Sequence, residues 1–239
     1  MFDLRYNEKN GRDTVHMPQI DELIRSTRKS ISLSVTREGR LVVRAPKRAS
    51  MAVIEEAVKK RSLWILEKQQ QSLARLDRFP VHVYAEGEAF LFLGKDLTLY
   101  YSANAKKAFA SGSVLFVPAN KREKAAQAVE TWYKEQARVH FASRLEYFSA
   151  AMGVRYTSLR LSSAAARWGS CGVNGSINLA WRLVAAPDWA VDYVVVHELA
   201  HILNRDHSAA FWAEVGRILP DYKKRRKALN EYAPLLLDR

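Results

Sequence analysis

The chain has a single cysteine, Cys171, among its 239 residues, so no disulfide can form within it. This scarcity is typical of a reducing compartment, and we expect a cytoplasmic protein. There are only 10 glycines and 7 prolines, which excludes collagen-like and linker-dominated chains. No apolar run approaches the ~20 residues that a membrane-spanning helix needs, and charges occupy the first residues, where a signal peptide would be apolar. We therefore expect a soluble protein with no membrane partner.

Positive charge is in excess, because 38 lysines and arginines stand against 25 acidic residues and leave a formal charge of +13. With 48% hydrophobic residues the chain can still bury a core, which excludes intrinsic disorder. The densest basic cluster covers residues 223–227. Such a cluster is typical of a solvated helix face, and it is also what a nucleic acid would bind. Both interpretations stay open on the sequence.

The hydrophobic pattern predicts an α+β protein in two parts. Residues 1–118 are expected to form a β-rich region with one helix, and residues 119–239 the domain that carries the chemistry. In the first part, alternating apolar residues predict a hairpin over 31–43 and a helix over 50–74. Three further short apolar runs predict strands before Pro118.

The second part is expected to open with a long helix over 121–152, which a glycine ends. Two strands are expected over 155–161 and 176–184, with a compact polar turn between them. Pro187 and Asp188 then open another helix, because proline suits a first helical turn and aspartate can accept its free N–H groups. This last helix carries the chemistry.

The last helix contains the motif His197-Glu198-Leu-Ala-His201. Residues four apart lie on one face of a helix, so His197 and His201 can direct their imidazoles at one metal ion. Glu198 can take a proton from a water on that ion and pass it on as a general acid. With six histidines in the chain, fewer than ~2% of such sequences would contain the pattern by chance. We therefore predict a metal site rather than ordinary surface histidines.

Five residues separate a third histidine, His207, from His201, and a continuous helix would carry it away from the metal. We expect the chain to turn at Asn204, because asparagine tolerates left-handed backbone better than other non-glycine residues. Three neutral imidazoles and a water form a catalytic ligand set, whereas structural zinc sites recruit several thiolates. We expect one zinc ion per chain, with His197, His201 and His207 as ligands and Glu198 as the catalytic acid and base.

Four further residues are weaker candidates for contacts to the ligands or the substrate. Asp192 and Asp206 can accept the outer N–H group of a ligand imidazole, although Asp206 is equally suited to cap the helix that follows it. Tyr193 can donate to a developing oxyanion or pack in the core. Cys171 can approach the metal if its turn folds back, and is otherwise a small buried hydrophobe.

Seven segments carry a resemblance to a known family: Arg167-Trp-Gly-Ser-Cys171, Ile177-Asn-Leu179, Trp181-Arg-Leu183, Asp192 through His201, His207-Ser208, Phe211-Trp212 and Pro220-Asp-Tyr222. Together they closely resemble the YgjP-like metal-dependent hydrolases, relatives of the SprT-like and WLM-type zinc metallopeptidases. The resemblance is most specific over residues 154–232 and extends upstream to Phe90 through Lys95. It implies a zincin-like catalytic domain of the HExxH, gluzincin-like type, with zinc on the three histidines and Glu198 as acid and base.

Three functions remain open. The leading hypothesis is a zinc-dependent peptidase in which a zinc-activated water attacks a peptide carbonyl, with the strand over 176–184 holding the peptide extended. The alternative is a metal-dependent nucleoside triphosphate pyrophosphatase, a label that some family members carry, which would bind phosphates through surplus lysines and arginines. No Walker-type glycine-rich loop supports that nucleotide hypothesis. The third is a nucleic-acid-binding module with a non-catalytic metal site.

Overall fold

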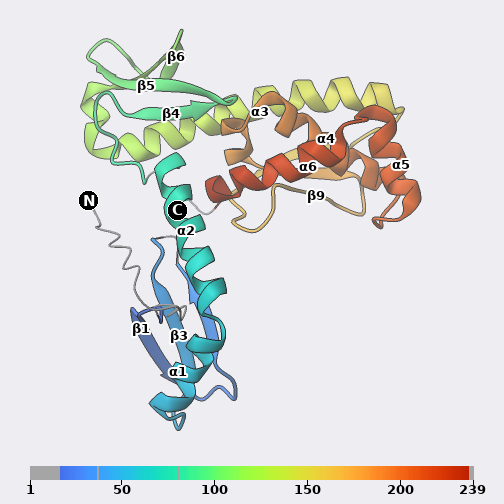
Figure 1. Cartoon of the computed structure of the whole chain (residues 1–239). Coiled ribbons are helices and arrows are strands. Elements are labelled where there is room, and N and C mark those ends of the chain that lie inside the picture. The colour runs from blue at the N-terminus through green and yellow to red at the C-terminus, as the bar shows by residue number, and fades with distance from the viewer. Residues whose placement is uncertain (1–16, 37, 80, 237–239) are drawn as a thin grey trace, which may run out of the picture. The chain divides into compact units, whose positions relative to one another are not determined.

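The computed structural model describes residues 17–36, 38–79 and 81–236 and shows a mixed α+β protein (Figure 1). The chain divides into two compact units after residue 80. The boundary that we expected at 118 lies inside the second unit, because the sheet ending there shares one hydrophobic core with the helix that follows it. Among the described residues, no helix is long and apolar enough to cross a membrane.

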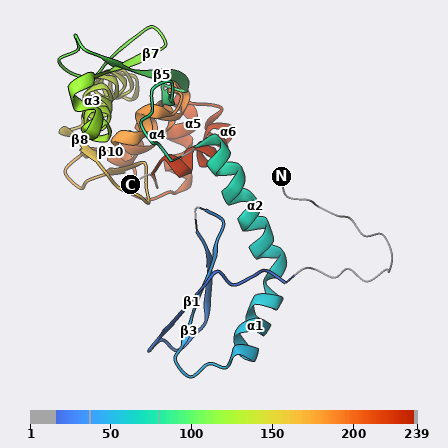
Figure 2. The same ribbon diagram turned by 90° about the vertical axis from the view of Figure 1, so that its left-hand side faces the viewer.

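The first unit places a three-stranded sheet against two helices (Figure 2). Its elements are β1 (Glu22–Ser26), β2 (Ser32–Val35), β3 (Leu41–Pro46), α1 (Met51–Lys60) and α2 (Ser62–Arg78). Strand β3 is central, parallel to β1 and antiparallel to β2. Two helices replace the single helix expected over 50–74, because Arg61 departs from helical backbone angles and ends α1. Alternate residues of β3 pack on these helices, and the buried core is Leu41, Val43, Ala45, Ile54, Val58 and Ile65.

The second unit begins with a four-stranded sheet and a long helix. The strands are β4 (Ala89–Phe92), β5 (Lys95–Ser102), β6 (Phe109–Ser111) and β7 (Val114–Pro118), in the order β4-β5-β7-β6. The 3₁₀ helix η1 (Ala119–Lys124) leads into α3 (Ala125–Met152), so the regular helix starts later than expected. Gly153, with φ of 68°, caps α3 at the glycine that the sequence indicated. The apolar side of α3 is buried in the core that the sheet also lines.

A second, three-stranded sheet lies next to the predicted chemistry. It contains β8 (Ser158–Ser162), β9 (Gly169–Cys171) and β10 (Ser176–Ala180), with β10 between the other two. The strand expected over 176–184 therefore ends at Ala180, and the chain continues as the 3₁₀ helix η2 (Trp181–Ala185). A strand with two neighbours has no free backbone groups for a peptide, so the prediction that 176–184 binds substrate is wrong. The short strand β9 lies at the edge instead.

Three helices complete the second unit: α4 (Asp188–Leu203), α5 (Ala209–Ile218) and α6 (Tyr222–Leu229), followed by the 3₁₀ helix η3 (Asn230–Leu236). Most of α4 is buried, which explains its continuous run of valines. The start of α4 packs on the turn before β5, where Gly94 has φ of 75° and a Cβ would lie 2.6 Å from Cγ of Pro187. This packing fixes the helix that carries the predicted site.

Candidate metal centre

Helix α4 carries two of the three predicted ligands. His197 and His201 lie one turn apart on it, with ring centroids separated by 5.0 Å. The chain leaves the helix at Asn204, as expected, but through extended backbone angles (φ −133°, ψ 111°) rather than the left-handed conformation that we predicted. Nδ1 of His201 lies 3.2 Å from the carbonyl oxygen of Asn204. The residue that ends the helix therefore also orients the second imidazole.

The third histidine, His207, returns to the other two just before α5. One possible ligand atom from each ring lies within 4.8 Å of the others. Nε2 of His207 is 3.2 Å from Nε2 of His197. Two nitrogens bound at ~2.0–2.1 Å to a tetrahedral zinc ion are ~3.3 Å apart, so this spacing suits a shared ion. The structure thus brings together the three imidazoles that the sequence selected.

Burial keeps the two helical imidazoles neutral. It is the main reason that the pKa of His197 falls to about 3, and the two neighbouring imidazoles add to the effect. Burial also lowers the pKa of His201. Metal ions bind the unprotonated nitrogen of imidazole, so the chemistry of this donor set fits a metal at neutral pH.

The first predicted ligand, His197, lacks the outer hydrogen bond that metal-binding imidazoles usually make. Nδ1 of His197 is buried and has no hydrogen-bond partner among the described residues. The ring is instead packed against Phe211, a fully buried side chain whose ring centroid lies 4.6–5.0 Å from those of all three imidazoles. We infer that aromatic packing, more than hydrogen bonding, holds His197 in position.

Glu198 is the only buried acidic side chain among the described residues, with 5% of its surface exposed. Burial raises its pKa to about 7, against the opposing charge of Arg167. The side chain packs directly on β9, because a Cβ at Gly169 would lie 2.6 Å from Oε1 of Glu198 and 2.9 Å from its Cδ. Only a residue without a side chain leaves room for this approach. The carboxyl group therefore lies between α4 and the edge strand.

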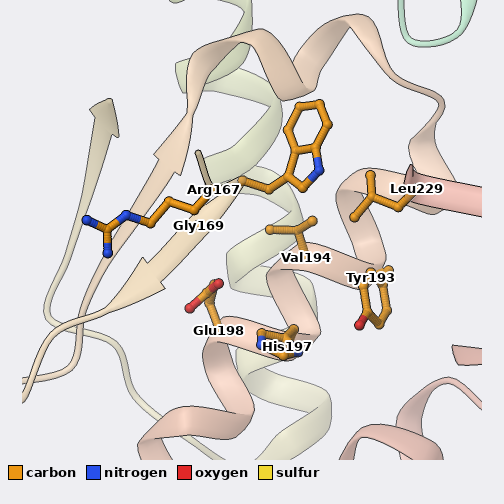
Figure 3. Close-up of a pocket in the computed structure, with 8 residues that line it drawn as sticks. Arg167, Gly169, Tyr193, Val194, His197, Glu198 and Leu229 are labelled. Atoms are coloured by element: carbon orange, nitrogen blue, oxygen red, sulfur yellow. The ribbon is translucent and has the colours of Figure 1, made fainter. Parts of the chain in front are cut away.

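A cleft of about 210 Å³ opens beside Glu198 and His197 (Figure 3). Its wall is largely apolar and comes from three parts of the unit: the segment entering β9, the middle of α4 and the end of α6. The residues lining it, besides those two, are Arg167, Trp168, Gly169, Tyr193, Val194 and Leu229. Glu198, the predicted acid and base, therefore lies beside a cleft that suits an apolar group.

Asp192 does not serve the imidazoles as we predicted. Its carboxylate accepts a hydrogen bond of 2.6 Å from Nε of Arg144 on α3. One turn earlier on each helix, His140 and Asp188 form a second pair at 3.0 Å. The expectation that Asp192 holds a ligand N–H group is therefore wrong, and this carboxylate instead attaches α4 to α3.

The other three weaker candidates lie around the site. Asp206 accepts from the backbone N–H of Ser208 at 3.2 Å, which forms a turn before α5, but Ser208 is the N-cap residue and no side chain caps this helix. Tyr193 lines the cleft, and its ring centroid is 5.9 Å from that of His197. Cys171 lies on β9, where burial raises the pKa of its thiol and keeps it in the unreactive form.

Nothing in the sequence indicated that Arg205 belongs to the site. Arg205, in the turn before the third histidine, donates to the carbonyl oxygens of Gly172 at 2.8 Å and Val173 at 2.7 Å. It thereby ties the turn carrying the third imidazole to the loop after β9. No local pattern marks these contacts, because the partners lie more than 30 residues apart along the chain.

A model of the YgjP-like metallopeptidase domain family matches residues 29–232, which is most of the chain. The chain belongs to this family. The resemblance drawn from the motif residues is thereby confirmed, and family membership supports a metal-dependent, peptidase-like role. A YgjP-like domain is also consistent with three imidazoles and a buried glutamate meeting at one place.

Among solved structures, this YgjP-like chain is similar to the crystal structure of the metallopeptidase zymogen of Pyrococcus abyssi abylysin. The two sequences are 22% identical, the match covers 37% of this chain and 90% of that chain, and the TM-score is 0.35. No curated protein matches the chain significantly. The classification therefore depends on the family model.

Proposed function

We propose that this YgjP-like chain is a zinc-dependent peptidase whose active site lies where α4 meets β9. The observation that carries the proposal is the convergence of three imidazoles, with 3.2 Å between Nε2 of His197 and Nε2 of His207, next to Glu198, the one carboxyl group that is buried in the described part of the chain. A metal ligand set beside a buried acid and base is what metal-assisted hydrolysis requires.

His197, His201 and His207 would hold the metal ion. Three imidazoles suit zinc and leave a coordination position for water or substrate. When bound, zinc supplies Lewis acidity that polarises a carbonyl group and lowers the pKa of water. Among the described residues, no second cluster offers the carboxylate oxygens that Mg²⁺ prefers, which favours the peptidase over nucleotide hydrolysis.

Glu198 would move the proton. Its pKa of about 7 without a metal reflects a carboxyl group that is poorly solvated and therefore strongly basic. Since a neighbouring cation lowers the pKa of a carboxyl group, Glu198 would be ionised at neutral pH in the loaded site. It could then accept a proton from water and deliver it to the leaving amine, as a general base followed by a general acid.

Strand β9 would bind the substrate backbone. Its ladder with β10 uses the backbone groups of Ser170, which leaves those of Gly169 and Cys171 directed at the open edge. A peptide could add there as one more strand. Because Glu198 packs directly on Gly169, such a peptide would lie beside the acid and base.

The cleft would accept one apolar side chain of the substrate. Its volume of about 210 Å³ exceeds the ~150 Å³ of an apolar cavity that binds benzene. Trp168, Val194 and Leu229 line it without an acidic group apart from Glu198. We therefore expect cleavage next to phenylalanine or leucine to be faster than cleavage next to lysine.

Elemental analysis and a casein-cleavage assay test the proposal. We expect about one zinc per chain and casein fragments that a chelator abolishes. Glu198→Gln should keep the zinc and lose cleavage, whereas the same change at the exposed Glu123, Glu123→Gln, should alter neither. Freshly purified protein without zinc would contradict the metal site. Zinc-loaded protein that hydrolyses nucleoside triphosphates and leaves casein intact would contradict the substrate class.

A further inference from the structure

The first unit gathers positive charge at one end of its sheet. Strands β1 and β3 are parallel and both finish at this end, and β2 begins there, because Ser32 pairs with Arg44. In Figure 2, α1 begins near the same end. Six basic residues occupy it, and we call them the basic end: Arg25, Arg28, Lys29, Arg44, Lys47 and Arg48. All are exposed except Arg28, which is half-buried.

No carboxylate of the described residues forms an ion pair with any member of the basic end. Their hydrogen bonds go to neutral oxygens instead. Arg25 donates to three backbone carbonyls at the end of β3 and in the loop after it, the nearest at 2.7 Å, and Arg28 donates to Oγ of Ser32 at 2.8 Å. Neutral acceptors orient a guanidinium group without cancelling its charge, so the positive field of the cluster is retained.

The amino end of α1 adds to this field. The helix begins at Met51, and its first turn contains no acidic residue that would neutralise the free N–H groups. Nη2 of Arg25 lies 3.7 Å from Sδ of Met51, which places that guanidinium at the helix end. Further along α1, Glu56 is paired with Lys60. Residues 1–80 carry +7 of the net +13, with 17 lysines and arginines against 10 acidic residues, although they are only about a third of the chain.

We propose that the basic end binds the phosphate backbone of a nucleic acid duplex. Arginine forks and lysines recognise phosphate oxygens, and several of them on one surface gain affinity by releasing counterions. The two segments that carry the basic end, residues 25–32 and 44–51, contain no aromatic residue on which unpaired bases would stack. This favours a duplex over a single strand. Contacts to phosphates do not distinguish one base from another, so binding should not depend on the nucleotide sequence. This inference does not depend on the peptidase activity.

Fluorescence anisotropy of the full chain with a labelled DNA duplex of about 20 base pairs tests the proposal through its salt dependence. The variant K29A/K47A/R48A removes three exposed cations of the basic end. At about 0.9 per phosphate contact, the slope of log K against log salt should fall by about 2.7. From ~50 to ~200 mM salt, the unsubstituted protein should then lose about 40-fold more affinity than the variant.

The matched control removes three exposed lysines from α6, in the variant K223A/K224A/K227A, and changes the net charge equally. It should keep the salt slope of the unsubstituted protein. Equal losses in both variants would attribute binding to net charge and overturn the proposal, as would the absence of duplex binding at ~50 mM salt. Binding to phosphatidylserine vesicles with no binding to the duplex would assign the basic end to a lipid surface and overturn it too.

Discussion

Replacing Gly169 with alanine is the sharpest test of how the edge strand and the acid and base fit together. The new Cβ would lie 2.6 Å from Oε1 of Glu198, about 0.8 Å short of the 3.4 Å at which ordinary contact begins. Because three atoms of the Glu198 side chain lie within 2.9 Å, rotating one oxygen away does not relieve the clash. The carboxyl group must therefore move by roughly 0.8 Å.

A shift of this size should be costly for catalysis and tolerable for folding. A misplacement of ~1 Å can slow an enzyme by ~10²-fold, so we expect kcat to fall by about 30- to 100-fold in Gly169→Ala. Overpacking of this kind costs about 1–3 kcal/mol of unfolding free energy. Zinc content should not change, because the three atoms nearest to the new Cβ all belong to Glu198.

Peptide-cleavage kinetics, zinc analysis and urea unfolding of the same preparations measure these three effects. Gly172→Ala is the matched control, because its Cβ would meet Oγ of Ser176 at 2.5 Å and Oδ1 of Asn174 at 3.0 Å in the same hairpin, and none of its three nearest atoms belongs to Glu198. A serine hydroxyl can rotate away, so we expect the control to keep its activity. If Gly169→Ala cleaved peptides within twofold of the unsubstituted protein, or if both variants lost activity equally, the assigned position of Glu198 would be wrong.

Three further changes probe the site. In chelator-treated protein, Glu198→Gln should be the more stable form by about 3 kcal/mol at pH 8 and equally stable near pH 4 in urea unfolding. The reason is that folding raises this pKa from 4.5 to about 7, so stability is lost as pH rises through that range. His207→Ala should weaken zinc binding more than ~100-fold in a competition assay, and unchanged affinity would exclude it as a ligand. Arg205→Ala should speed hydrogen exchange in the loop after β9, and Arg205→Lys should not restore protection, because lysine lacks the two-pronged donor.

Local sequence patterns correctly predicted the features that depend on residues close together in the chain. The spacing of His197 and His201 places them on one helical face. Helix α4 begins at Asp188, one residue after the proline at which its start was predicted. Gly153 ends α3 as its position after a long apolar repeat indicated. The α+β class and the family were also correct, because a motif of several clustered residue types is rare by chance.

Predictions that depend on contacts between segments far apart in the chain were wrong. An apolar run shows that a strand is buried, but not whether it lies in the centre or at the edge of its sheet. The pattern that predicted peptide binding by 176–184 therefore could not show that β9 is the edge strand. Asp192 was expected at the imidazoles, and its partner Arg144 is 48 residues away in the chain. The boundary at 118 was inferred from a change of element type, whereas the two sides share one core.

The amino-acid sequence alone determined the identity of the three histidines, the acid between two of them, and the helix that presents them, because helical periodicity relates neighbours to one another. Tertiary structure alone decided that Gly169 meets Glu198, that Arg205 ties the turn before His207 to the loop after β9, and that six cations of the first unit share one sheet end. These contacts join segments far apart in the chain, and which segments meet depends on how whole sheets and helices pack.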